Sequence, residues 1–221
     1  MKTMQINNTK VLGTSENDIL VASELIRSGA VVAFPTETVY GIGASIFDEQ
    51  AVDAIYRIKN RGYEKPLSAH ISDISMVQMV SDIVPDLFYE LAHYFLPGPL
   101  TMIIKSKPIV PSVVTSGSGT IAIRFPSNSV CKRFIDAVEH PIAATSANIA
   151  GNKSATNLEE VKSELDGQIA AIIDDGDCVL KQESTVISLI GKPQIVRVGA
   201  LSINEIEGRM GITLINKVQD R

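Results

Sequence analysis

The sequence predicts an α/β fold in which a twisted, mixed β-sheet is flanked by helices. Short apolar runs rich in β-branched residues alternate with amphipathic stretches along most of the 221 residues, which is the pattern of strands connected by helices. Residues 184–190 and 194–198 are separated by a turn containing Gly-Lys, which predicts a hairpin and hence antiparallel pairing. The sheet should therefore be mixed, rather than part of a sandwich or a helical bundle.

The chain is expected to begin with a helix and a buried strand. Apolar residues recur at helical spacing from Ile19 to Ile26, and Gly29 stands where a glycine commonly ends a helix. Residues 30–34 form a β-branched, apolar run that a proline closes. This run predicts a strand that leads into a loop over residues 35–44, PTETVYGIGA.

The middle of the chain alternates between both types of element. Asp48 is a suitable N-cap for a helix whose apolar residues follow the i, i+3, i+4, i+7 rule, and this helix should stop near Gly62. Further elements are predicted by periodicity and by turns: a strand at 66–71, helices at 73–83 and 85–95, a strand at 100–105, a strand at 120–125, a helix at 127–139 and a strand at 141–144.

The last part should contain a helix, a strand, the hairpin and a short final helix. Thr156 and Glu159 are spaced as a capping box for a helix through Leu165. Residues 169–173 read as a strand, and Ser202 with Glu205 caps the last helix. In sheets of this kind ligands gather at the ends of strands, where the polar loops PTET, TSAN and EST fall.

Composition and charge disfavour several classes of protein. A net charge of -5 and a pI near 5.3 disfavour a protein that coats nucleic acid. No stretch approaches the roughly 18 apolar residues of a membrane helix, and residues 1–11 lack the apolar core of a secretory signal. We therefore expect a soluble, cytoplasmic protein. Its length and 45% hydrophobic content fit one domain, residues 1–221, with a core over about residues 16–210.

Most familiar site motifs are missing. Cys131 and Cys178 stand far apart without a CxxC pair, so ordinary buried thiols are expected. The chain has no GxxxxGK[ST], no complete GxGxxG and no GxSxG, and its histidines form no HxxxH pair. No protein-bound metal site is therefore predicted. A nucleotide site would have to be built from scattered Lys, Arg, Ser, Thr and Asn.

Residues 57–65, RIKNRGYEK, gather four positive charges in this acidic protein. A solvated helix end is one explanation, because cations there complement the helix dipole. Lys59 and Arg61 are two residues apart, however, which places them on the same side of an extended chain. If the helix unwinds before Gly62, both can face one phosphate from a mostly exposed helix end. Arg57, one turn earlier, should face solvent.

Several fragments, taken in order, resemble the YrdC-like family of threonylcarbamoyl-AMP synthases over roughly residues 20–207. The fragments are GAVVAFPTETVYGIGA (29–44), the K-x-R of Lys59 and Arg61, KPLSAH (65–70), FLPGPLT (95–101), TIAIRFP (120–126), TSAN (145–148), GNKSAT (151–156), ESTVI (183–187) and IVRVGA (195–200). Any one of them is a weak signal, whereas the ordered set is strong.

The resemblance implies an enzyme of nucleotidyl transfer. It would combine L-threonine, bicarbonate and ATP into threonylcarbamoyl-AMP and pyrophosphate, the first step in forming N6-threonylcarbamoyladenosine in tRNA. It also implies a large, basic cavity, Mg²⁺ that accompanies ATP, and downstream proteins that transfer the threonylcarbamoyl group to tRNA. The short form of the family, without the extra C-terminal domain of longer relatives, is expected. The net charge adds an expectation of weak or no direct tRNA binding.

The resemblance also implies roles for particular residues. Lys59 and Arg61 resemble the catalytic cations that contact phosphates. The expected ATP site is Lys59, Arg61, Lys65, Thr120, Ser146, Asn148, Ser154 and Arg197. The expected threonine pocket is Thr38, His70, Arg124 and Ser184. Arginine suits such a pocket because it grips a carboxylate with two parallel hydrogen bonds.

For each residue assigned to the threonine pocket there is also a purely structural explanation. Thr38 and Ser184 could only cap turns, and His70 could be a semi-buried histidine without a ligand. Arg124 is harder to dismiss, because a charge in an apolar strand needs a partner and its neighbours in the sequence offer none. We expect that partner to be the substrate carboxylate.

Three positions depart from the family, and two other functions stay open. Thr145, Ala155 and Val198 replace prolines that are usual in the family, which affects loop rigidity more than chemistry. A carbamoyltransferase that handles carbamoyl adenylate is one alternative, although the cysteine pairs of such chains are absent here. A non-catalytic RNA-binding module is the other, although the acidic charge and the few aromatic residues disfavour it.

Overall fold

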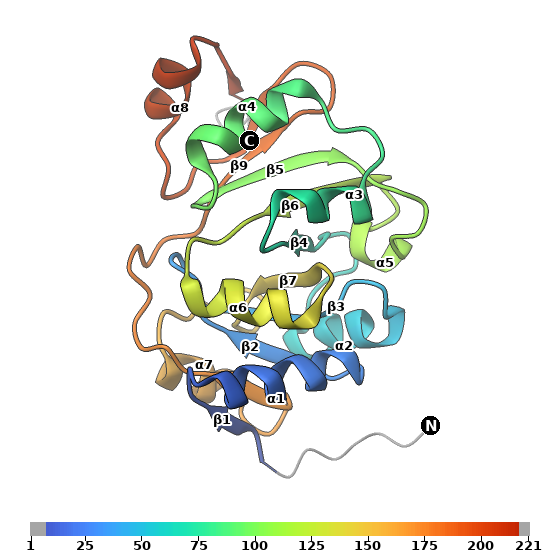
Figure 1. Ribbon diagram of the computed structural model, residues 1–221, viewed down its shortest axis with the longest axis vertical. Coiled ribbons are helices and arrows are strands. Elements are labelled where there is room, and N and C mark those ends of the chain that lie inside the picture. Colours follow the sequence, from blue (N-terminus) through green and yellow to red (C-terminus); the bar gives the residue numbers. More distant parts are fainter. Residues whose placement is uncertain (1–7, 217–221) are drawn as a thin grey trace.

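A computed structural model describes residues 8–216, and its strands form one mixed sheet of eleven strands. The strand order is β1-β8-β2-β3-β7-β4-β6-β5-β9-β10-β11, with both parallel and antiparallel neighbours. Helices lie on both sides of this sheet (Figure 1). The predicted mixed α/β architecture is confirmed. No helix within residues 8–216 combines the length and the apolar character needed to cross a membrane.

The elements follow the predicted alternation. The strands are β1 (Lys10–Leu12), β2 (Val32–Phe34), β3 (Gly41–Ser45), β4 (Ser68–His70), β5 (Leu100–Lys105), β6 (Thr120–Arg124), β7 (Ile142–Ser146), β8 (Ala171–Ile173), β9 (Thr185–Ser188), β10 (Gln194–Arg197) and β11 (Ile215–Asn216). The helices are α1 (Glu16–Arg27), α2 (Glu49–Lys59), α3 (Val77–Val80) after the 3-10 turn η1 (Ile74–Met76), α4 (Asp86–Phe95), α5 (Ser112–Thr115), α6 (Ser129–Val138), α7 (Leu158–Leu165) and α8 (Ile203–Met210).

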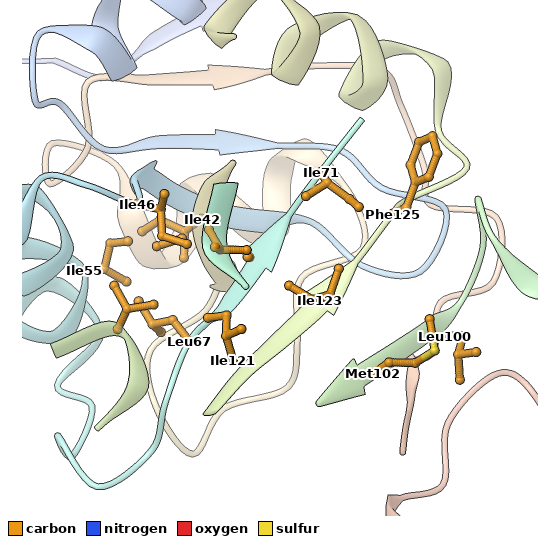
Figure 2. Packing of buried hydrophobic residues seen from close by; sticks show 14 of the residues in the cluster. Ile42, Ile46, Ile55, Leu67, Ile71, Leu100, Met102, Ile121, Ile123 and Phe125 are labelled. Carbon is orange, nitrogen blue, oxygen red and sulfur yellow. The ribbon is translucent and has the colours of Figure 1, made fainter. Parts of the chain in front are cut away.

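Two apolar layers hold the sheet, one on each face. On one face α1 and α6 pack side by side, and Phe134 of α6 meets Phe34 of β2 with ring centroids 5.5 Å apart. On the other face Ile42, Ile55 and Ile123 belong to a larger cluster (Figure 2). Because strand side chains alternate between faces, the residues beside Ile123 point away from this cluster. These residues, Ala122 and Arg124, are therefore free to line a site on the opposite face.

The predicted helix ends are confirmed where capping chemistry is local. The Asp48 carboxylate accepts hydrogen bonds from the backbone N–H groups of residues 50 and 51 at the start of α2. Ser202 accepts from the N–H of Glu205 at the start of α8. Gly29 follows the C-cap of α1 with φ +85°, a conformation that glycine adopts without strain. Both cysteines are free and buried, as predicted.

Residues 41–44 were predicted as part of a loop, and that prediction is wrong. They belong to β3, which pairs with β2 on one side and with β7 on the other. Glycines at 41 and 43 weaken the strand signal in the sequence. They are required by packing, because a Cβ on Gly43 would lie 2.6 Å from the Ile142 side chain. Close packing, rather than turn formation, explains these glycines.

Other differences concern short elements and one cap. The N-cap of α7 is Asn157 rather than Thr156, and Thr156 instead donates from its N–H and hydroxyl to the Glu160 carboxylate. The helix predicted at 73–83 is reduced to η1 and α3. Strands β1 and β11 and helix α5 were not predicted, because elements of two to four residues carry no readable period.

The close packing of Gly199 after β10 makes a testable prediction. A Cβ at this position would lie 2.2 Å from the Glu183 carbonyl oxygen, so Gly199→Ala must displace backbone. We expect its free energy of unfolding in urea to fall by about 2 kcal/mol or more. The control is Gly208→Ala in α8, where nothing lies within 4 Å of the added methyl group. This variant should be up to about 1 kcal/mol more stable, because alanine is the better helix former. Equal effects of both variants would contradict the packing argument.

Candidate functional site

A cavity of about 460 Å³ lies over one face of the central strands. Its floor is built from residues two apart on four strands, namely Ser68 and His70 of β4, Thr101 and Ile103 of β5, Ala122 and Arg124 of β6, and Ala144 and Ser146 of β7. The register places His70 and Thr101 on either side of Arg124. The volume lies in the range typical of small-molecule sites.

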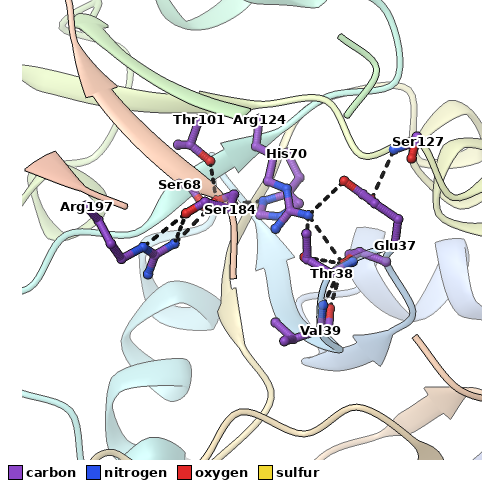
Figure 3. A network of polar contacts seen from close by, with 11 residues as sticks. Glu37, Thr38, Val39, Ser68, His70, Thr101, Arg124, Ser127, Ser184 and Arg197 are labelled. Carbon is purple, nitrogen blue, oxygen red and sulfur yellow. Dashed lines mark hydrogen bonds and ion pairs between the residues drawn. The ribbon is translucent and has the colours of Figure 1, made fainter. Parts of the chain in front are cut away.

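Three polar loops complete the walls, as the sequence predicts. Thr36 belongs to the PTET loop after β2, Ser146 belongs to TSAN at the end of β7, and Ser184 belongs to the EST segment before β9. All three residues line the cavity, although they lie far apart in the sequence. Figure 3 shows Glu37 and Thr38 of the PTET loop next to Arg124.

The cavity is suited to anions. Arg61, Arg124 and Arg197 line it, whereas Glu183 is the acidic residue among the lining residues. His70 adds no charge, because burial and the neighbouring Arg124 lower its pKa from 6.5 to about 3. It is therefore neutral at physiological pH, when one ring nitrogen donates and the other accepts. The residues thus offer an excess of positive charge and of hydrogen-bond donors.

Arg124 is the deepest charge of the site, with 6% of its surface exposed. Its Nη2 donates to Glu37 Oε1 at 3.1 Å, to the Thr38 hydroxyl, and to the Thr36 hydroxyl at 3.4 Å. The neighbours of Arg124 in the sequence offer no partner for this charge, and the structure provides one in Glu37, which the sequence analysis missed. Glu37 lies 87 residues earlier, beyond the reach of local reasoning. Within residues 8–216 the buried Nε has no hydrogen-bond partner.

A second cluster joins Arg197, the last residue of β10, to Ser184, the residue before β9. The Ser184 hydroxyl lies 2.8 Å from the Thr101 hydroxyl, and the Ser184 carbonyl accepts from Arg197 Nε and Nη2 at 3.1 and 3.0 Å. Arg197 also pairs with Glu183, whose other oxygen accepts from the Ser154 hydroxyl at 2.7 Å. Ser184 is therefore more than a turn cap, because it connects β5 with the end of β10.

Lys59 does not lie at an exposed helix end, contrary to the sequence prediction. It is 1% exposed and does not line the cavity. Its Nζ donates to the carbonyl oxygens of Ser146, at 2.5 Å, and of Asn148, and its own carbonyl accepts from the N–H of Ala150 at 2.8 Å. Lys59 therefore holds the TSAN loop against the end of α2. Burial, with a smaller effect of Arg61, lowers the pKa of its ammonium to about 8.

Arg61 is the member of the K-x-R pair that reaches the cavity. The helix ends at Lys59, and Asn60 takes the left-handed conformation, which turns the chain before Arg61. The Arg61 Nε and Nη2 donate to the carbonyls of Lys65 and Pro66 at 3.0 and 3.1 Å. Arg57 is exposed, as predicted, and it pairs with Asp53. Lys59 and Arg61, the two members of the K-x-R pair, thus have different surroundings.

The structure separates the predicted site residues into two groups. Those that line the cavity are Arg61, His70, Arg124, Ser146, Ser184 and Arg197. Those that do not line it are Thr38, Lys59, Lys65, Thr120, Asn148 and Ser154. Thr38, Lys59, Asn148 and Ser154 still bond to residues at the wall or to the TSAN loop. Lys65 is exposed, and the Thr120 hydroxyl pairs with that of Ser118 at 2.9 Å.

The lining residues that the sequence analysis did not assign to a site include Thr36, Ser68, Thr101 and Glu183. A signal for Ser68 existed, because it lies two residues before His70 and must share its face of β4. Thr36, Thr101 and Glu183 lie within the fragments PTET, FLPGPLT and ESTVI. Only the cross-strand register, which the sequence does not reveal, identifies Thr101 as the neighbour of Arg124.

Comparison with known proteins gives consistent matches. The Sua5_yciO_yrdC family, described as "Telomere recombination", matches residues 24–199. The threonylcarbamoyl-AMP synthase of Pyrococcus abyssi is 41% identical over 194 residues, covering 87% of this chain and 57% of that protein. That of Bacillus subtilis is 40% identical over 221 residues, covering 98% and 64%. The crystal structure of P. abyssi Sua5 complexed with L-threonine has a TM-score of 0.91 at 39% identity, covering 94% of this chain and 62% of that one. The chain thus spans about three fifths of the length of these relatives.

The buried Lys59 ammonium predicts a pH dependence of stability. An unfolded lysine releases its proton near pH 10.5, whereas Lys59 releases it near 8, so the unfolded chain binds more protons between these values. The free energy of unfolding should therefore rise with pH in this window. Lys59→Met lacks this contribution. We expect the stability of the wild type relative to Lys59→Met to increase by about 1–3 kcal/mol between about pH 8 and 10. Urea titrations at several pH values measure it, and a constant difference would contradict the burial of a charged Lys59.

Proposed function

The chain belongs to the Sua5_yciO_yrdC family, and from this premise we propose that it is an L-threonylcarbamoyladenylate synthase. Such an enzyme converts L-threonine, bicarbonate and ATP into threonylcarbamoyl-AMP and pyrophosphate. One observation carries the proposal: Arg124 lies on the cavity floor with an unpaired Nε, and Arg61 and Arg197 line the same cavity. The cavity thus offers one deep cation for a carboxylate and two more for phosphates. The names of the related proteins support the same reaction.

Threonine fits the part of the cavity around Arg124. Its carboxylate would accept hydrogen bonds from the guanidinium, which suits this role through charge and planar geometry. Neutral His70 and the Ser184 hydroxyl would meet the threonine hydroxyl, and Ala122 with Ile103 offers apolar surface to its methyl group. Thr38 would contribute through Arg124, whose Nη2 it binds. L-threonine bound to the related P. abyssi Sua5 supports this assignment.

ATP fits beside this pocket. Arg61 and Arg197 would contact its phosphates, and Ser146 would add a hydroxyl on the TSAN loop. Lys59 and Asn148 would act by shaping that loop, and Ser154 by orienting Glu183. Arg61 takes the catalytic role, because a cation fixed near the α-phosphate stabilises the charge that develops as the phosphoryl group transfers. Lys65 and Thr120 lie outside the cavity wall and are assigned no direct contact.

The reaction needs positioning more than an activated side chain. The threonine amine and bicarbonate form an N-carboxy carbamate with loss of water. The carbamate oxygen then attacks the α-phosphorus of ATP, and pyrophosphate leaves. No covalent enzyme intermediate is required, so aligning three reactants is the main task of the cavity.

Mg²⁺ would enter as part of the MgATP substrate. Within residues 8–216 no three His, Cys, Asp or Glu side chains are grouped so that they could hold a metal ion. Glu183 lines the cavity, but its oxygens already bind Ser154 and Arg197. A magnesium ion bound mainly by phosphate oxygens and water agrees with this arrangement. The product would pass to other proteins that modify tRNA, and this chain would bind tRNA weakly because its net charge is -5.

Pyrophosphate release tests the function directly. In a mixture of the chain with MgATP, L-threonine and bicarbonate, we expect pyrophosphate only when all three are present. Serine, which lacks only the methyl group of threonine, should be a weaker substrate. Valine should be a very poor one, because its missing hydroxyl leaves buried polar groups unpaired. Equal release with valine would refute the threonine pocket. Release that requires a carbamoyl donor instead would favour a carbamoyltransferase, and tight, salt-resistant tRNA binding without release would favour an RNA-binding module.

Arg61→Ala tests the phosphate site. We expect its rate of pyrophosphate release to fall roughly a hundredfold or more, because a cation that stabilises developing charge is lost. The matched control is Arg57→Ala, which removes an exposed cation of the same cluster. That variant should keep its activity and lose no more than about 0.5 kcal/mol of stability. Equal and slight losses of activity in both variants would show that the positive charges of this cluster act only through their combined electrostatic field, without a specific phosphate contact.

A further inference from the structure

Glu37 is a buried carboxylate that has no role in the reaction described above. It is 7% exposed and does not line the cavity. Its Oε1 accepts from Arg124 Nη2, and its Oε2 accepts from the backbone N–H of Ser127, each at 3.1 Å. Its backbone carbonyl accepts from the N–H of Leu180 at 2.8 Å. Glu37 is therefore fixed by three contacts, and Figure 3 shows its carboxylate between Arg124 and the backbone of Ser127.

The hydrogen bonds of Arg124 are one-sided. Each one that its guanidinium donates within residues 8–216 comes from Nη2, to Thr36, Glu37 and Thr38 of the PTET loop. The Nε is buried and donates to no group in the same part of the chain. An unpaired buried donor destabilises a protein, and a buried ion pair contributes little net stability. Stability alone therefore does not account for this arrangement, whereas presenting free donors to a ligand does.

We propose that Glu37 is a positioning residue for recognition of the amino-acid carboxylate. By holding Nη2 against the PTET loop, it fixes the plane of the Arg124 guanidinium and leaves Nε and Nη1 for the ligand. A planar guanidinium binds a carboxylate well in only a few orientations, so restricting its rotation lowers the entropic cost of binding. The assignment of the ligand rests on the proposed function. The contact by which Glu37 fixes Arg124 does not rest on the proposed function.

Steady-state kinetics test the effect on substrate. Glu37→Ala should raise the KM for threonine roughly tenfold or more and leave the KM for ATP within about twofold, because the loss concerns only the carboxylate end of the cavity. Glu37→Gln keeps an oxygen that accepts from Nη2 and should rescue most of the threonine KM. The control is Glu160→Ala, which removes a carboxylate that binds Thr156 away from Arg124. Its KM for threonine should stay unchanged.

A second measurement reports on Arg124 without any reaction. In ¹⁵N-labelled protein the Nε–Hε signal of Arg124, identified by its loss in Arg124→Lys, should be sharp and protected from solvent exchange. In Glu37→Ala the signal should broaden or exchange faster, and in Glu37→Gln it should persist. If Glu37→Ala does not fold, as judged by thermal denaturation, the Gln variant decides: loss of its Arg124 signal would mean that Glu37 acts only by neutralising charge.

The outcomes separate the two proposals. An unchanged Arg124 signal in folded Glu37→Ala overturns the positioning role, and so does an unchanged threonine KM. Equal increases in the KM values for threonine and ATP would mean a general structural role and would also overturn it. If the wild type releases no pyrophosphate, the proposed function fails, while the Arg124 signal still shows whether Glu37 fixes the guanidinium.

Discussion

The two-residue alternation of side chains along the central strands is the constraint on which the site depends. In β6 it sends Ile121 and Ile123 into the larger apolar cluster and leaves Ala122 and Arg124 on the cavity floor. The apolar residues fix the register, because a slip by one residue would exchange the two faces and bury the guanidinium in the apolar cluster. The same register aligns His70 and Thr101 with Arg124. By fixing the register, the apolar core also fixes the positions of His70, Thr101 and Arg124 on the opposite face of the sheet.

Two long-range polar contacts then turn the open sheet face into a shaped cavity. The Glu37–Arg124 pair binds the PTET loop to the end of β6, and Lys59 binds the TSAN loop to the end of α2. Both contacts are buried, so neither is weakened by salt as a surface ion pair would be. Each contact also involves a cation, Arg124 or Lys59, for which the sequence resemblance implies direct binding of a ligand. Glu37 and Lys59 shape the wall without lining the cavity, whereas Arg61, Arg124 and Arg197 line it.

The sequence predicted well what local physics determines and failed where distant segments meet. The caps at Asp48 and Ser202, the alternation of β6 and the late hairpin were predicted because neighbouring residues decide them. The burial of Lys59 was not, since carbonyl oxygens almost ninety residues away in the chain create its environment. The Glu37 partner of Arg124 was missed for the same reason. The glycines of β3 misled prediction, because their role in close packing against Ile142 appears only in three dimensions.

Charge on the whole chain and charge in the cavity act in opposite directions, which bears on the kind of anion that the cavity admits. The net charge of -5 repels long polyanions, whose phosphates must approach many surface points at once. A small anion that enters the cavity instead meets three arginines within about 460 Å³, partly shielded from water, where their attraction is stronger than at the surface. Neutral His70 lets the floor hold polar ligands without adding a fourth cation. A compact ligand that carries both phosphates and a neighbouring carboxylate is therefore favoured over an extended nucleic acid.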